Sequence, residues 1–149
     1  MEALLAEHAQ RAHRRIVSLE SAELQMAVIV PADAHDALAL VDQALTQLED
    51  HTGRRVLVRL VAAWERGDLA TLEHYEEWCE CAASDDDRAF LHRLNDERNP
   101  QLADRIDALA RSGRRVFAAV GVLHMTGPQA LPALLAARGF RVERVKLAR

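Results

Sequence analysis

The sequence predicts a helix-rich α/β fold: a small parallel sheet of about three strands that carries a large helical insertion. Three observations support this prediction. Residues 116–121 (VFAAVG) form a continuous apolar run, which is typical of a parallel strand buried on both faces. Residues 22–112 show apolar side chains at helical spacing almost throughout. The last third of the chain then follows the order strand, helix, strand.

The chain begins with a predicted helix and a short strand. Residues 2–12 repeat alanine and leucine at helical spacing, and residues 15–19 (RIVSL) are rich in β-branched side chains and bounded by charge. Ser21 can cap a helix that runs to about residue 30, and a second helix then extends to about residue 50. The helical insertion therefore starts immediately after the first strand.

Local stop and start signals divide the rest of the insertion into further helices. Gly67 ends one helix and Asp68 caps the next, while Ser84 has the spacing of a capping box with the acids that follow it. Asn99 and Pro100 form an N-cap and first-turn pair. The predicted helices cover residues 54–66, 69–82, 84–98 and 99–112.

The C-terminal third reads as a βαβ unit. After residues 116–121, Gly127 and Pro128 open a helix that Gly139 closes, and residues 140–145 alternate like an edge strand. No repeat, linker or low-complexity tract interrupts the sequence. We therefore expect a single domain over residues 1–149.

Composition and charge exclude several classes of protein. Half of the residues are hydrophobic and the net charge is −4, so no overall positive field would attract nucleic acid or an anionic membrane. No apolar run is long enough to cross a membrane and no signal peptide is visible, so we expect a cytoplasmic protein. Cys79 and Cys81 are too few and too close to form a disulfide framework, which favours a reducing compartment or an incidental pair.

His124 is the strongest candidate for a functional residue. It lies just beyond the carboxyl end of the best predicted strand, where ligands bind in open α/β sheets. Gly121 and Gly127 on either side would allow tight turns that bring the imidazole into a cleft, where it could bind a metal or transfer a proton. The alternative is an ordinary histidine in a loop that leads into a helix.

Two groups of polar residues could join His124. Asp96, Glu97, Arg98 and Asn99 lie at a helix-to-helix junction and offer carboxylate, guanidinium and amide groups. Glu20 directly follows the first strand, at the same sheet edge as His124 if those strands are parallel. A helix end, an N-cap and a solvated acid explain the same residues without any function. The other histidines read as solvated residues on helix surfaces or ends.

Several ordered motifs resemble the C-terminal portion of the TraB/GumN family, which includes the animal Tiki proteins. They are SLES at residues 18–21, AWERGDL at 63–69 followed by Leu72 and Glu73, ERN at 97–99, VGVLHMTG at 120–127 and GFRV at 139–142. The resemblance implies a hydrolase-like α/β fold with a metal-dependent site, proteolytic in the Tiki branch, that holds Mn, Co or Zn.

The resemblance also assigns roles to individual residues. It implies His124 and Glu20 as metal ligands, Glu97, Arg98 and His124 as catalytic residues, and Asn99, Gly121 and Gly127 as binding residues. The family's first Gly-x-x-His motif and its N-terminal half have no counterpart in this sequence.

Two hypotheses follow. The chain is a metal-dependent hydrolase of peptides or other small substrates, or it is a catalytically incomplete binding and assembly module. In either case a homodimer or a separately encoded N-terminal half would supply the missing groups, with no nucleic acid and no membrane as partner. The hydrolase hypothesis requires metal binding through His124, and the module hypothesis predicts none.

Overall fold

The computed structural model describes residues 2–145. Met1 and residues 146–149, the ends of the predicted domain, lie outside the described residues, and the single domain stays a prediction. The elements are α1 (Glu2–Arg11), α2 (Ala22–Ile29), α3 (Ala34–Glu49), α4 (Thr52–Arg66), α5 (Leu69–Glu73), α6 (Tyr75–Trp78), α7 (Asp85–Leu94), α8 (Asn99–Arg111), the 3-10 helix η1 (Val122–Met125) and α9 (Leu131–Ala137).

Most helices begin at the capping residues that the sequence indicates. The hydroxyl of Ser21 accepts a hydrogen bond from the backbone of Leu24 and so caps α2. Asp68 caps α5, and Ser84 forms a reciprocal capping box with Asp87 at the start of α7. These side chains satisfy backbone N–H groups that a first helical turn leaves free, so helix starts are encoded locally.

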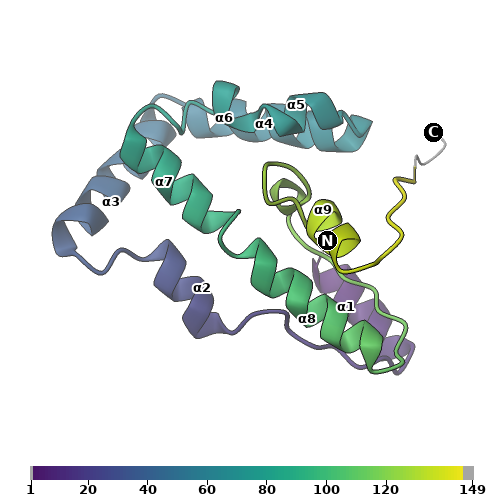
Figure 1. Cartoon of the computed structure of the whole chain (residues 1–149). Helices are drawn as coiled ribbons and strands as arrows, with labels where there is room; N and C mark the ends of the chain where they lie inside the picture. Colours follow the sequence, from purple (N-terminus) through teal and green to yellow (C-terminus); the bar gives the residue numbers. More distant parts are fainter. Residues whose placement is uncertain (1, 146–149) are drawn as a thin grey trace.

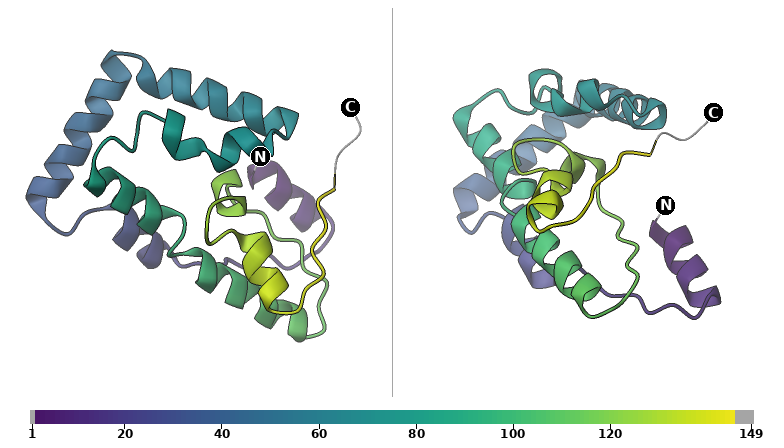
Figure 2. Two further views of the ribbon diagram at one scale, coloured as in Figure 1. Left: turned by 45° about the horizontal axis from the view of Figure 1, so that its top comes forward. Right: turned by 45° about the vertical axis from the view of Figure 1, so that its right-hand side comes forward.

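The helices form an open arrangement around a small core. In the view of Figure 1, helix α2 lies below α7, α3 to its left and α4 above it, and α9 lies beside α8 (Figures 1 and 2). The core consists of Leu102, Ala103 and Leu131, which pack α8 against α9. Leu19 and Val120 pack against it from the segments that precede α2 and η1. The candidate residues sit beside this α8–α9 contact.

The predicted α/β fold with a parallel sheet is wrong, because no strand occurs among residues 2–145. The predicted strands at residues 15–19, 116–121 and 140–145 follow an irregular path, and no backbone hydrogen bond joins any two of them. An apolar run becomes a strand only when a neighbouring strand pairs with its backbone. Here Phe117 is 80% exposed and Val145 is 79% exposed. The apolar pattern is present, but the described residues supply no pairing partner.

No single helix among the described residues is long and apolar enough to cross a membrane. Helices α2 and α3 pass that test of length and composition only as a pair, and they are bent by 81° at the break between them.

Cys79 and Cys81 form a disulfide, contrary to the expectation of a reduced or incidental pair. Cys79 is 1% exposed and closes a loop with a residue only two positions away. Such a short loop constrains the unfolded chain little, so this disulfide stiffens the turn after α6 and does not staple distant elements.

Candidate functional site

Glu20 and Arg98 form a partly buried ion pair across 78 positions of sequence. The Nε of Arg98 donates to Oε1 of Glu20 at 2.8 Å, and Nη2 donates to Oε2 in the two-point geometry that suits guanidinium and carboxylate. The side chains are only 16% and 6% exposed, respectively. Hydrogen bonding from Arg98 lowers the pKa of Glu20, which therefore stays ionised. This pair joins the segment that precedes α2 to the start of α8.

Asn99 and His124 form a second pair, which is buried. Nδ2 of Asn99 donates to the backbone carbonyls of His124 and Gln129, at 3.3 and 2.8 Å. Its Oδ1 is therefore the acceptor for Nδ1 of His124, 2.7 Å away. The Asn99 amide thus determines the tautomer: Nδ1 of His124 carries the hydrogen, and the lone pair of the neutral ring is on Nε2.

The environment of His124 favours the neutral ring. Burial is the largest effect that lowers its pKa, and the positive charge of Arg98 adds to it. Three groups raise the pKa: the charge of Glu20, the backbone carbonyl of Asn95 and the charge of Asp96. Arg98 and Asn99 are adjacent at the start of α8, so the two pairs belong to one site, and the charges of Glu20 and Arg98 both act on His124. A neutral imidazole with a fixed tautomer can serve as a base or as one metal ligand.

Helix α8 begins one residue earlier than the sequence suggested. Asn99 is its first residue and not its N-cap, which is Arg98. The reason is that the Asn99 side chain, which is fully buried, turns inward to His124 and Gln129 and cannot cap its own helix.

The two predicted binding glycines lie beside the site, but only one needs to be glycine for its backbone. Gly127 has φ of +86°, in the left-handed region, and a Cβ there would lie 3.3 Å from Oδ1 of Asp96. Gly121 has φ of −58°, which any residue adopts, and its Cβ would be 3.7 Å from the His124 ring.

The structure does not bring Glu97 into contact with the other candidates. Its carboxylate instead lies 3.2 Å from Nδ1 of His92, and both side chains are more than half exposed. Asp96, to which the sequence assigns no separate role, is buried at 7% exposure. Asp96 and Glu97 are adjacent in the sequence, and the sequence does not indicate which of the two carboxylates turns inward.

The candidate residues of one chain do not fit a complete metal site. Catalytic zinc needs about three protein ligands and an open position. His124 offers one nitrogen, and both oxygens of Glu20 already bind Arg98. Among residues 2–145, three potential ligand atoms gather within 4.8 Å only at Asp33, His35 and Asp36.

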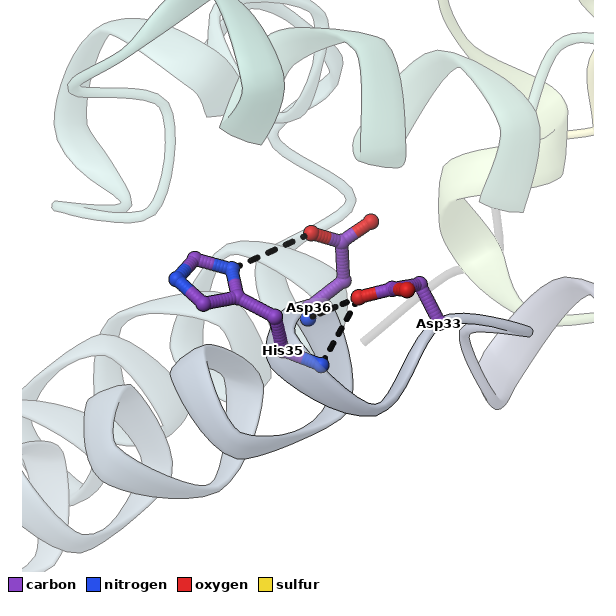
Figure 3. A group of neighbouring side chains, drawn as sticks. All are labelled: Asp33, His35 and Asp36. Atoms are coloured by element: carbon purple, nitrogen blue, oxygen red, sulfur yellow. Dashed lines mark hydrogen bonds and ion pairs between the residues drawn. The ribbon is translucent and has the colours of Figure 1, made fainter.

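That exposed group has an ordinary structural explanation. Oδ1 of Asp33 accepts hydrogen bonds from the backbone N–H groups of His35 and Asp36, at 2.7 and 3.3 Å (Figure 3). The His35 ring lies beside the Asp36 carboxylate at 3.7 Å. Asp33 is thus the N-cap of α3.

We expect His124 to make stability depend on pH. The unfolded chain takes up a proton near pH 6.5, whereas folded His124 resists it, so its contribution is complete above that value and is lost as pH falls toward the lowered pKa. Urea unfolding at about pH 7.5 and about pH 5.5 measures the loss. In His124→Asn, which keeps a donor for Asn99, the loss should be smaller. Equal losses in both proteins would contradict this expectation.

We expect Gly127→Ala to destabilise the protein by about 2 kcal/mol. Gly139 is the matched control, because its φ is +90° and nothing lies within 4 Å of the point that a Cβ would occupy. Gly139→Ala should therefore cost only the backbone strain, about 1 kcal/mol. Thermal unfolding of both variants measures the difference, which isolates the contact with Asp96. A larger loss for Gly139→Ala would contradict the role of Asp96.

Comparison with known proteins places these motifs in one family. The family model described as "TraB/PrgY/gumN family" matches residues 1–144. No curated protein and no solved structure gives a significant match.

Proposed function

The chain belongs to the TraB/PrgY/gumN family, and we propose that it is a binding and assembly module, which a different polypeptide completes by supplying extended, acidic segments. The observation that carries this proposal is the run of exposed residues at 114–119, which holds Val116 and Phe117. Ile16 and Val142 are exposed in the same way, at 55% and 45%. Apolar residues in unpaired segments are a surface to which another chain can add strands.

The charge of these segments favours a different polypeptide over a second copy. Arg15 lies in the first segment and Arg114 and Arg115 begin the second, while the third holds Arg141 and Arg144 together with Glu143, which pairs with Arg141. Strands of two identical copies would place these arginines near one another, and like charges on paired strands are destabilising. A partner whose strands carry Asp or Glu would instead be attracted and aligned.

The state of the candidate site also supports an incomplete module. Arg98 holds the Glu20 carboxylate, so one chain offers His124 as its single predicted ligand atom. A partner that lies along residues 114–120 would reach the residues next to η1, which carries His124. The second candidate function is metal-dependent hydrolysis in the completed assembly. It is favoured by the neutral, tautomer-fixed imidazole, and a bound Mn, Co or Zn ion would supply an activated water.

Native mass spectrometry with and without added Mn²⁺, Co²⁺ or Zn²⁺ is the first test. The proposal predicts a monomer without stoichiometric metal. Metal bound one to one in the wild type and lost in His124→Ala would overturn the module in favour of a self-sufficient metal site. A dimer that dissociates in Phe117→Asp would overturn the choice of a different polypeptide.

A strand-forming peptide tests the predicted partner chemistry. We expect a peptide of alternating valine and glutamate to bind and to increase the β signal in circular dichroism, whereas the same peptide with lysine should not bind. Phe117→Asp should abolish binding. Leu48→Asp, which changes an apolar residue of α3 that is 70% exposed, is the matched control and should bind normally. Equal binding of both peptides would overturn the proposal.

A further inference from the structure

A polar pocket of about 250 Å³ is lined in part by residues next to His124. Residues 72–77, from the end of α5 and the start of α6, form one wall. Asn95 and Asp96, after α7, form the second, and Leu123, Thr126, Gly127 and Pro128 form the third. Three segments far apart in sequence thus enclose it, and His124 is not among its lining residues.

The charged side chains that line the pocket are acidic. Its lining includes Glu73, Glu76, Glu77 and Asp96, and no arginine or lysine. Of these acids, Glu77 is partnered, since its Oε1 lies 2.9 Å from Nδ1 of His74. The others have no ion pair among residues 2–145. A concave surface with such an excess of carboxylates attracts cations.

Asp96 is the second and independent observation. It is 7% exposed, and its carboxylate has no hydrogen-bond partner among the described residues. Since every side-chain oxygen that is sealed from solvent has a hydrogen-bond partner in the described residues, the carboxylate of Asp96 is open to solvent, and the residue lines the pocket. A Cβ at Gly127 would lie 3.3 Å from Oδ1 of Asp96, so the glycine keeps that oxygen uncovered on the pocket side.

The arrangement fits an organic cation better than a metal ion. Ligand atoms of three residues do not gather within 4.8 Å at this pocket, whereas they do at Asp33, among the residues that the structure describes. Separated carboxylates suit the several N–H donors of an ammonium or guanidinium group. Half-buried Tyr75 adds an aromatic wall, which favours the same kind of cation.

We propose that this pocket binds the ammonium or guanidinium group of an organic cation, with Asp96 as the central carboxylate and Glu73 and Glu76 at its rim. The cation comes either from a free alkylamine or from a lysine or arginine side chain of a peptide. This proposal concerns the isolated chain and depends on neither the assembly partner nor hydrolysis.

Titration of the full chain with n-butylamine, followed by protein NMR, tests the pocket. Saturable shifts should appear at Asp96, Thr126 and Gly127, and n-butanol, which is similar in size but neutral, should cause none. Asp96→Asn should weaken binding about tenfold or more, the loss expected for one charged hydrogen bond. Glu49→Gln, which removes the same charge from the exposed end of α3, should leave binding unchanged.

Further arms identify the source of the cation and protect the test against misfolding. Tighter binding of the blocked peptide Ala-Lys-Ala than of n-butylamine identifies a peptide side chain, and the reverse identifies a free amine. If Asp96→Asn does not fold, the double variant Glu73→Gln/Glu76→Gln should show weaker binding in its place. Equal binding of n-butanol, binding that no variant weakens, or no saturable binding of either cation would overturn the proposal.

Discussion

Replacing Arg98 with methionine is expected to lower the free energy of unfolding by about 3 kcal/mol. The substitution keeps much of the apolar length of the side chain and leaves the Glu20 carboxylate buried without its partner. It also removes the bond from Nη1 to the carbonyl of Leu94. Urea unfolding at neutral pH measures the loss.

An exposed pair on the same helix provides the control. Arg111 binds Asp107 one turn away, and its side chain is 69% exposed, so Arg111→Met should cost less than about 1 kcal/mol. Adding Glu20→Gln to Arg98→Met should recover part of the stability, because no unpaired charge remains buried. Equal losses of unfolding free energy in Arg98→Met and Arg111→Met would show that burial of the Glu20–Arg98 pair does not contribute to stability.

The Arg98 effect should also depend on pH in a defined direction. Since the pKa of Glu20 is lowered from 4.5, the pair contributes fully above that value and loses its contribution as pH falls through the lowered pKa. The difference between wild type and Arg98→Met should therefore shrink in acid. The loss at His124 begins as pH falls below about 6.5, whereas the loss at Glu20 begins only below about 4.5, so the two effects start at different pH values.

The sequence predicted what is encoded locally. Ser21 and Ser84 act on backbone groups within three residues of themselves, and Gly67 ends α4 with φ of +61°. Such signals need no knowledge of the rest of the chain, so most helix starts of the insertion were predicted. The single helix predicted at residues 69–82 is wrong, because α5 and α6 divide it and end at Trp78, and the helix predicted to residue 98 ends at Leu94. The TraB/GumN resemblance, which rests on motifs in order, was confirmed by the family match.

The sheet failed because strand formation is not local. Residues 116–121 have the apolar pattern of a buried strand, but that pattern cannot show whether a neighbour is present to pair with them. In the described residues none pairs, and Phe117 remains exposed. The prediction treated the pattern as sufficient, whereas pairing also requires a second segment with matching register.

The candidate site was predicted in part for a similar reason. Motif order indicated Glu20, Arg98, Asn99 and His124, and the structure joins them as a partly buried ion pair and a buried hydrogen-bonded pair. Which of the adjacent acids Asp96 and Glu97 turns inward depends on how α7 ends and α8 begins, and the sequence does not give that geometry. The assignment of Glu20 as a metal ligand stays a prediction, and in this structure both of its carboxylate oxygens bind Arg98.

Asn99→Ala is expected to be as destabilising as the loss of Arg98, about 3 kcal/mol or more. Asn99 is fully buried, and its amide satisfies two backbone carbonyls and the His124 ring at once. Alanine would leave those three groups buried without this partner. Urea unfolding measures the change. Asn95→Ala is the matched control: Asn95 is the C-cap of α7 and is only half-buried, so its replacement should cost much less.

Asn99→Asp separates the structural role of this residue from its effect on His124. The carboxylate can still accept the hydrogen bond from Nδ1, but it cannot donate to the carbonyls of His124 and Gln129, so the protein is again less stable. The new negative charge favours the protonated ring, so the pKa of His124 should rise from its lowered value. Titration of the His124 ring proton by NMR measures that rise. An unchanged pKa in a folded Asn99→Asp protein would mean that Asn99 does not determine the state of the histidine, and that the two residues are neighbours without a shared role.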